Sequence, residues 1–407
     1  MKNCLEQKRV NNTFVIIVSV LLERISYYGV RSMLILYMIG ETLQIAHYEA
    51  ITIYQYMLIF LLFSQLLGGI FGDFVLKNKK SILIGGIVAV LGCVLFCIPN
   101  INMMYLGILF LTLGSGFLKP NMLAAYGKTY YNDKQYLDTA FSLYHLVVNI
   151  GAFIGVLLFA YISDSFGFLV GFGFAGVLYL LTALVSFAIS ETDEKLQYNQ
   201  QSASSYAILY IVIAMVTSVA FWALYEMSGT SRYMLGADES FMSQLSAYFS
   251  KEILDYIDAV FLIPLLIIFG GIWLKFHRSQ FLKIALGFLF GSLALFQFSQ
   301  ISIGNFQENI VYLFSGIFFY SLAEIYIVVI TFSIITRYTN PKYLTTIMAL
   351  LASLIGAIVY LVNPITSFLF NNDPSLSTYV GLSISIAITV MLFLGFFFGK
   401  KISKTNG

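Results

Sequence analysis

Four polar side chains recur along the first apolar stretch of the sequence. Their spacing of i, i+3, i+4 and i+7 places them on one face of a helix: Arg24, Tyr27, Tyr28 and Arg31. Guanidinium groups bind carboxylates through paired hydrogen bonds, and phenols hydrogen-bond a small polar ligand while packing against its apolar parts. The stripe therefore predicts a site for a small ligand that carries a carboxylate. The alternative is internal pairing, such as Arg24 with Glu23, that only helps helices to assemble.

Other charged residues also interrupt apolar stretches. Lys119 is basic, and Glu23, Glu226 and Glu324 are acidic. A formal charge near the centre of a membrane-spanning helix costs about 2.5 to 3.5 kcal/mol on insertion scales, so such residues usually face a water-filled cavity. We therefore expect these side chains to line one hydrated cavity that several helices form.

The elements that position these residues are transmembrane helices. The chain of 407 residues is 59% hydrophobic and 10% charged, with a mean hydropathy of +0.86, which excludes a soluble domain. Apolar stretches near the ~20 residues needed to span a bilayer occur at roughly 14–38, 50–72, 81–99, 101–125, 139–162, 168–190, 206–228, 256–275, 283–303, 309–335, 343–370 and 378–398. The sequence therefore predicts an all-α polytopic membrane protein with twelve spans.

The distribution of Lys and Arg predicts the orientation of the spans. If the N-terminus is cytoplasmic, 17 of the 22 basic residues fall in cytoplasmic segments, 2 in outer segments and 3 within spans. Both termini should then be cytoplasmic, in the inner membrane of a bacterium. The first span is interrupted by Glu23 and lacks a small-residue cleavage site, so we expect a retained helix and no signal peptide. Neither a basic face nor a motif indicates a nucleic-acid partner.

A polar segment divides the chain in two. Residues 191–205 form a predicted cytoplasmic linker between two six-helix bundles, residues 1–190 and 206–407. Two such halves suit a transporter whose bundles rock about a site near the midplane of the membrane. The outer segment 229–255 is expected to be a loop with one short helix. Cysteines and histidines have no metal-ligand spacing, and we expect no metal, no cofactor and no enzymatic activity.

Five stretches together resemble one transporter family. The first span, with ERISYYG, is similar to the ExxERFxYYG motif of the proton-dependent oligopeptide transporter family, a branch of the major facilitator superfamily. GSGFLKPNM resembles the GxGxxKPN motif of that family and contains Lys119, and FSLYHLVVNIGAFIG contains Asn149 at its asparagine position. FWALYEMSGTS resembles FWAxxEQxGSS and contains Glu226, and LAEIY contains Glu324.

The resemblance implies a role for each matched residue. It implies that Arg24 and Lys119 neutralise the carboxyl terminus of a peptide, and that Glu324 and Asn149 receive its amino terminus. Tyr27 and Tyr28 would contact the peptide itself.

The resemblance also implies a gate and a coupling ion. Glu226 would pair with Arg31 to close an outer gate between spans 1 and 7. Protonation of Glu226, with Glu23 as a second candidate, would loosen that gate, because a neutral acid no longer holds a cation. Protons would thus be the coupling ion.

The sequence departs from the family pattern at several positions. Val20 replaces the first acid of the ExxER motif, which leaves Glu23 to act alone and the proton stoichiometry open. Asp258 occupies the position of an asparagine, where it would either bind an amine in the cavity or cap the start of a helix. The tryptophan usual in span 11 is absent. In the loop GGIFGDF, Asp73 matches the acid of a superfamily motif and is expected to help latch helices on the inner side.

The resemblance implies a major facilitator fold and a proton-coupled symporter that imports di- or tripeptides by alternating access, acting as a monomer in the lipid bilayer. A transporter of another small zwitterion or carboxylate is the alternative within the same class. A non-transporting membrane sensor or scaffold is the alternative from another class. The charged stripe argues against the scaffold, since apolar residues would assemble helices at lower cost.

Overall fold

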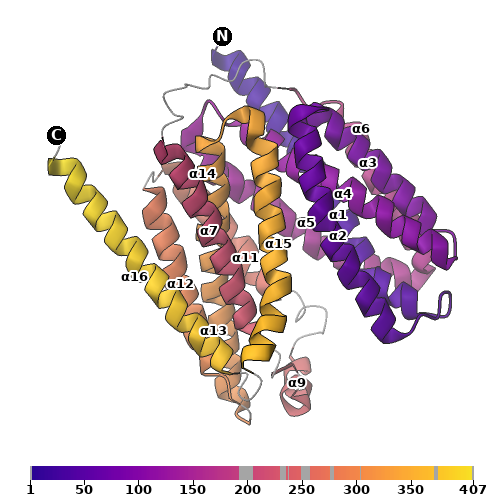
Figure 1. Ribbon diagram of the computed structural model, residues 1–407. Coiled ribbons are helices and arrows are strands. Elements are labelled where there is room, and N and C mark those ends of the chain that lie inside the picture. The colour runs from indigo at the N-terminus through magenta and orange to yellow at the C-terminus, as the bar shows by residue number, and fades with distance from the viewer. Residues whose placement is uncertain are drawn as a thin grey trace. The chain divides into compact units, whose positions relative to one another are not determined.

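The structure is a computed structural model of the chain. It describes residues 2–191, 205–229, 235–236, 238–248, 257–275, 279–302, 304–370 and 375–405 (Figure 1). The helices are α1 (Lys2–Ile39), α2 (His47–Phe74), α3 (Lys77–Phe96), α4 (Ile101–Thr129), α5 (Leu137–Phe166), α6 (Phe168–Ser186), α7 (Ser205–Met227), α9 (Glu239–Ser246), α11 (Ile257–Lys275), α12 (Gln280–Ser299), α13 (Phe306–Glu324), α14 (Ile330–Tyr338), α15 (Leu344–Leu369) and α16 (Leu376–Thr405). In these described ranges no strand occurs.

In the part of the chain that the structure describes, twelve helical segments are long and apolar enough to cross a membrane. They coincide with the twelve predicted spans, which confirms the all-α fold class and the multi-pass membrane character of the chain. Some helices extend beyond the apolar window: α1 begins at Lys2 and α16 continues to Thr405. The predicted span 309–335 is built from α13, a π-helical segment at Ile325–Val329, and α14. Hydropathy reports apolar length but not a local change in helix winding.

The residues group into two compact units by contact. Unit 1 comprises Met1–Ala140, Tyr144–Ile208 and Ile335–Gly356, and unit 2 comprises Phe141–Leu143, Leu209–Ile334 and Ala357–Gly407. The proposed division at the segment 191–205 lies largely outside the described residues.

Small residues allow the helices of unit 1 to approach closely. A Cβ atom at Gly155 of α5 would lie 2.6 Å from the backbone oxygen of Ile25, and one at Gly151 would lie 2.6 Å from Cβ of Arg24. Glycines four residues apart thus form the face of α5 that packs on α1, the arrangement by which membrane helices gain packing contacts. Helix α3 packs against both α4 and α6 (Figure 1).

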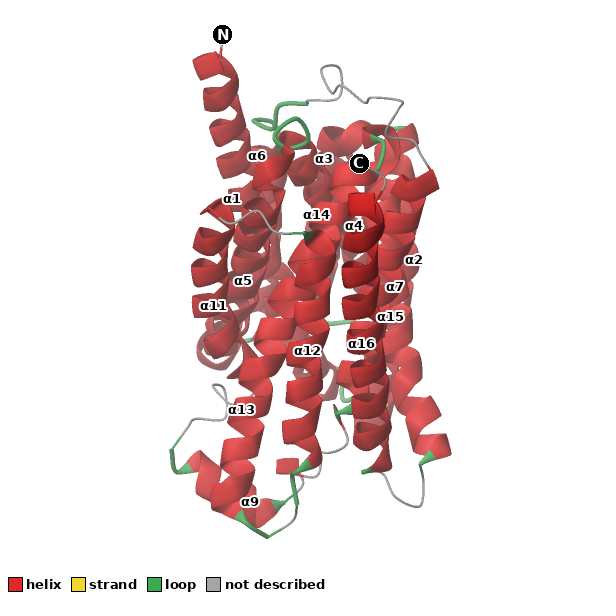
Figure 2. Ribbon diagram, turned by 90° about the vertical axis from the view of Figure 1, so that its left-hand side faces the viewer, coloured by secondary structure: helices red, strands yellow, loops and turns green. Residues whose placement is uncertain are grey.

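Unit 2 is organised around α12, which packs against α13 and α16 (Figure 2). The predicted short helix in the segment 229–255 is confirmed as α9. Asp238 caps it, because its carboxylate accepts hydrogen bonds from the backbone N–H groups of Ser240 and Phe241. The apolar face of α9 packs on side chains near the start of α13, including Phe306 and Ile310.

Asp73 joins the end of α2 to the start of α15 within unit 1. Its carboxylate accepts a hydrogen bond from the backbone N–H of Thr345 at 3.3 Å. It also accepts bonds from the backbone N–H and the hydroxyl of Thr346 at 2.6 and 2.8 Å. A carboxylate at a helix N-terminus satisfies free N–H groups and complements the helix dipole. The expectation that Asp73 latches helices is therefore confirmed.

Candidate functional site

The predicted stripe on α1 lies within unit 1 and is largely withdrawn from solvent. Tyr27 is 3% exposed and Arg24 is 9% exposed, while Tyr28 and Arg31 are half-buried. The rings of Tyr27 and Tyr28 meet edge to face, with centroids 5.4 Å apart. The helical period therefore places these four residues on one face, as the spacing predicts.

Lys119 of α4 lies against this stripe. Its Nζ is 3.1 Å from the centroid of the Tyr27 ring, and the guanidinium carbons of Arg24 and Arg31 lie 5.9 and 5.5 Å from the same centroid. An aromatic face attracts cations through its quadrupole, most strongly where water is excluded. The ring thus holds three like charges close together that would otherwise repel one another.

Arg31 has a further aromatic partner, on α2, that the sequence reasoning missed. Its Nε donates a hydrogen bond of 2.7 Å to the hydroxyl of Tyr54 on α2, and its guanidinium carbon lies 5.5 Å from the centre of that ring. The only signal for Tyr54 in the sequence is a polar aromatic residue within an apolar span. Such residues are common, so the signal becomes specific only when the packing of α2 on α1 is known.

Glu23 is completely buried on α1. Its Oε2 lies 2.6 Å from Nε of Arg24, so the internal pair considered as an alternative does form. The approach lacks hydrogen-bond geometry, and within the described part of the chain neither carboxylate oxygen has a hydrogen-bond partner. Tyr179 of α6 and Tyr144 of α5 lie near this carboxylate. One buried acid thus partly offsets the charge of three basic groups.

Val20 and Asn149 complete the predicted positions in unit 1. Val20 is 1% exposed, one turn before Glu23, so an apolar side chain fills the place of the first acid in the motif. Asn149 is half-buried on α5, two residues before Gly151, which packs against Arg24. Its Nδ2 donates a hydrogen bond of 2.9 Å to the backbone oxygen of His145, which leaves its side-chain oxygen available as an acceptor.

The predicted acids of unit 2 lie on three different helices. Glu226 on α7 accepts a hydrogen bond of 3.3 Å from Nδ2 of Asn363, and Asp258 in the first turn of α11 accepts one of 3.2 Å from the hydroxyl of Tyr225. Glu324 is 8% exposed at the end of α13 and directly precedes the π-helical segment. Departures of this kind from α-helical winding are frequent at functional sites.

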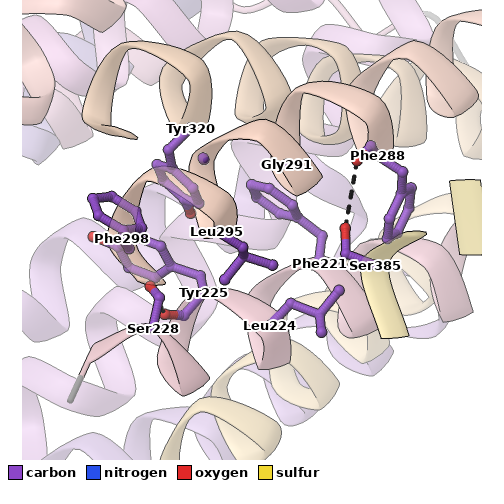
Figure 3. A pocket seen from close by; sticks show the side chains of 11 residues that line it. Phe221, Leu224, Tyr225, Ser228, Phe288, Gly291, Leu295, Phe298, Tyr320 and Ser385 are labelled. Carbon is purple, nitrogen blue, oxygen red and sulfur yellow. Dashed lines mark hydrogen bonds between the residues drawn. The ribbon is translucent and has the colours of Figure 1, made fainter. Parts of the chain in front are cut away.

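An aromatic stack links α7 and α13, which carry Glu226 and Glu324. Tyr320, one turn before Glu324, stacks on Tyr225 at 4.0 Å between centroids and on Phe221 at 5.1 Å (Figure 3). The same residues line a cavity of about 10 Å³, about the space of one water molecule. A larger pocket of about 320 Å³ is lined by Asp258 and Tyr225 together with apolar residues of α9 and α13.

The arrangement separates the charges by unit. In unit 1 Arg24, Arg31 and Lys119 outnumber Glu23, whereas the site residues predicted in unit 2 are all acidic. The pairing of Arg31 with Glu226 stays a prediction, because the two residues belong to different units. Within the described residues, no group of three or more His, Cys, Asp or Glu could hold a metal ion.

A family model matches most of the chain. The model describes the Major Facilitator Superfamily, and it aligns with residues 16–364. This chain belongs to the major facilitator superfamily.

Curated relatives match about half of the chain. The chain is 28% identical over 242 residues to the dipeptide and tripeptide permease A of Erwinia pyrifoliae. The matched stretch covers 58% of this chain and 48% of the relative. The chain is 26% identical over 220 residues to the di-/tripeptide transporter of Lactococcus lactis, which covers 51% of this chain and 44% of the relative. The matched stretch thus spans about half the length of these relatives.

Solved structures share the fold over nearly the whole chain. A crystal structure of the peptide transporter POT with sulfate matches with a TM-score of 0.66 at 19% identity, and covers 94% of each chain. A POT family transporter in complex with a thioalcohol-conjugated peptide matches with a TM-score of 0.67 at 17% identity, and covers 94% of this chain and 95% of the other. At these identities the structures establish the major facilitator fold alone, and that predicted fold is confirmed.

Proposed function

We propose that this chain is a proton-coupled symporter that imports di- or tripeptides across the cytoplasmic membrane, with both termini in the cytoplasm. The cluster of Arg24, Arg31 and Lys119 around the Tyr27 ring carries this proposal. Burying like charges is costly unless an anion enters among them, so the cluster favours a ligand with a carboxylate. The named permeases among the relatives support a peptide as that ligand.

The acids of unit 2 supply the complementary chemistry. A zwitterionic peptide needs cations at its carboxyl end and an acid at its amino end, since either charge left unpaired costs several kcal/mol when desolvated. Glu324, which is buried next to an aromatic stack, is the proposed acceptor for the amino group, and Asn149 of unit 1 is the proposed second acceptor. The bundles 1–190 and 206–407, joined by the linker 191–205, would alternate in opening this site to the two sides of the membrane.

Uptake by proteoliposomes tests the ligand. Labelled Ala-Ala should accumulate when an inward proton gradient is imposed, whereas Ala-Ala amide, which lacks the carboxylate, should compete with it poorly. In Lys119→Ala, unlabelled Ala-Ala should compete less well for uptake of the labelled dipeptide. The variant should then distinguish little between Ala-Ala and its amide. Lys342→Ala, an exposed lysine outside the cluster, is the matched control. Uptake of the amide at the rate of the free acid would contradict a carboxylate-binding role.

Coupling to protons is tested separately. We expect Glu226→Gln to retain exchange of labelled for unlabelled peptide across the membrane, because a neutral amide still hydrogen-bonds Asn363. The variant should lose accumulation driven by the proton gradient, since it has no proton to exchange. Accumulation at the level of the unmodified protein would remove Glu226 from the coupling mechanism.

A transporter of another small zwitterion is the second candidate. The pocket of about 320 Å³ lined by Asp258 and Tyr225 favours it, because an added carboxylate suits a ligand with an extra amine. If no dipeptide or tripeptide is taken up while an amine-bearing amino acid is, this candidate replaces the first.

A further inference from the structure

A basic pocket lies in unit 1, apart from the charged stripe of α1. It has a volume of about 670 Å³, and lysines from two helices contribute to its lining: Lys8 of α1, and Lys79 and Lys80 of α3. The residues that follow α6 complete the lining. The starts of α1 and α3 and the end of α6 lie at the same membrane face, because each successive span reverses direction. The pocket therefore opens where helices leave the bilayer.

The charge of the pocket is positive. Lys79 donates a hydrogen bond of 2.6 Å from its Nζ to the backbone oxygen of Phe187, which anchors the start of α3 to the end of α6. Glu191 is the one acid in the lining, and its Oε2 lies 3.7 Å from Nζ of Lys77 outside the pocket. Among the described residues, neither Lys8 nor Lys80 has an acid within salt-bridge distance. Two exposed ammonium groups thus remain available to an anion.

Exposed apolar stripes lead from this pocket along the spanning helices. On α3, Lys80 is followed on the same helical face by Ile84, Ile87 and Leu91, which are 38%, 47% and 48% exposed. At a rise of 1.5 Å per residue the eleven steps from Lys80 to Leu91 extend about 16 Å, about half of a hydrocarbon core that is roughly 30 Å thick. That length matches a single leaflet.

The end of α6 has a stripe of the same kind. Leu180, Leu184 and Phe187 recur at helical spacing and are 44%, 52% and 59% exposed. Because α3 and α6 pack together, the two stripes border one helix pair. A ligand held at the lysines could therefore lay apolar chains along both helices.

We propose that this pocket binds the headgroup of an anionic phospholipid, whose acyl chains lie along α3 and α6. The lysines supply the charge complementarity, and the stripes distinguish a lipid from a free anion. Basic pockets at the ends of membrane helices bind anionic headgroups in this way. The site is independent of the proposed transport function, since it uses none of the residues of the charged stripe.

Lipid binding to the purified full-length protein in detergent tests the proposal. Native mass spectrometry measures adducts with palmitoyl-oleoyl phosphatidylglycerol and with phosphatidylcholine of the same chains. Lys8→Gln/Lys80→Gln should weaken phosphatidylglycerol binding about 30-fold, the effect expected of two lysines at a membrane surface. The charge-conserving pair Lys8→Arg/Lys80→Arg should retain it.

The matched control removes two exposed lysines from elsewhere in the chain. Lys275→Gln/Lys342→Gln changes the net charge equally and should alter binding by no more than about twofold. If the double pocket variant unfolds at a lower temperature, the single variant Lys80→Gln should still weaken binding roughly fivefold.

Three results would overturn the proposal. They are an equal loss in the control pair, phosphatidylcholine binding as tight as phosphatidylglycerol binding, and displacement of the lipid by an equal concentration of inorganic phosphate, which would assign the pocket to a free anion.

Discussion

Replacing Tyr27 tests whether its ring organises the charged cluster. Tyr27→Leu removes the aromatic face that lies 3.1 Å from the Lys119 ammonium and within 6 Å of two guanidinium groups. A desolvated cation–π contact contributes about 2 kcal/mol, and every 1.4 kcal/mol is a tenfold change in affinity. Without the ring the Lys119 ammonium is no longer held in place for the ligand carboxylate, so returning it to that place on binding should raise the dissociation constant for a dipeptide by up to about 30-fold.

The measurement compares Tyr27→Leu, which loses the aromatic ring, with Tyr27→Phe, which keeps it. Tyr27→Phe retains the ring face and loses only the hydroxyl, so its dissociation constant should stay within a few fold of that of the unmodified protein. Binding is followed by isothermal titration in detergent, and uptake by proteoliposomes gives a second value. Equal losses in both variants would show that the hydroxyl, rather than the ring face, holds the ligand.

Thermal unfolding supplies a measurement that needs no ligand. Without the ring, three like charges remain close together in a site of low polarity, where their repulsion is strong. Tyr27→Leu should lower the free energy of unfolding by at least about 2 kcal/mol, and Tyr27→Phe should lower it much less. Unchanged stability in the leucine variant would refute the proposed role of the ring.

Three further perturbations address other parts of the structure. Gly155→Ala places a methyl group 2.6 Å from the backbone oxygen of Ile25. The variant should be less stable by about 1 to 3 kcal/mol, measured by thermal unfolding. Gly271→Ala is the control that should not lose stability, because the added atom meets open space. Asp73→Ala removes a helix cap of about 0.5 to 2 kcal/mol, so hydrogen exchange at the first amides of α15 should accelerate between about 2-fold and 30-fold; unchanged exchange would show that the cap is dispensable. Glu23→Gln should retain peptide exchange but lose accumulation driven by a proton gradient, and full accumulation would exclude Glu23 from coupling.

Much of the fold could be predicted because hydropathy is a local property. A window of about twenty residues contains enough apolar surface to identify a span, and all twelve spans were found in this way. The face shared by Arg24, Tyr27 and Arg31 follows from the helical period alone. The π-helical segment after Glu324 could not be predicted, since apolar residues such as those at 325–329 fit either winding.

The candidate site could be predicted only as a set of positions. The sequence motifs identify Lys119 as a site residue, but the contact of its ammonium with one particular ring depends on the close packing of neighbouring helices. Tyr54 was missed for the same reason, because its hydrogen bond to Arg31 joins two helices. The complete burial of Glu23 is likewise a result of packing, here against α4, α5 and α6.

The sequence by itself thus determined which segments cross the membrane and which polar residues share a helix face, because both depend on spacing along one chain. Only the tertiary structure decided which cations meet over the Tyr27 ring, which acid is withdrawn from water and where Asp73 caps another helix. Those outcomes depend on distances between helices, and glycines such as Gly151 and Gly155 set them by allowing backbones to approach.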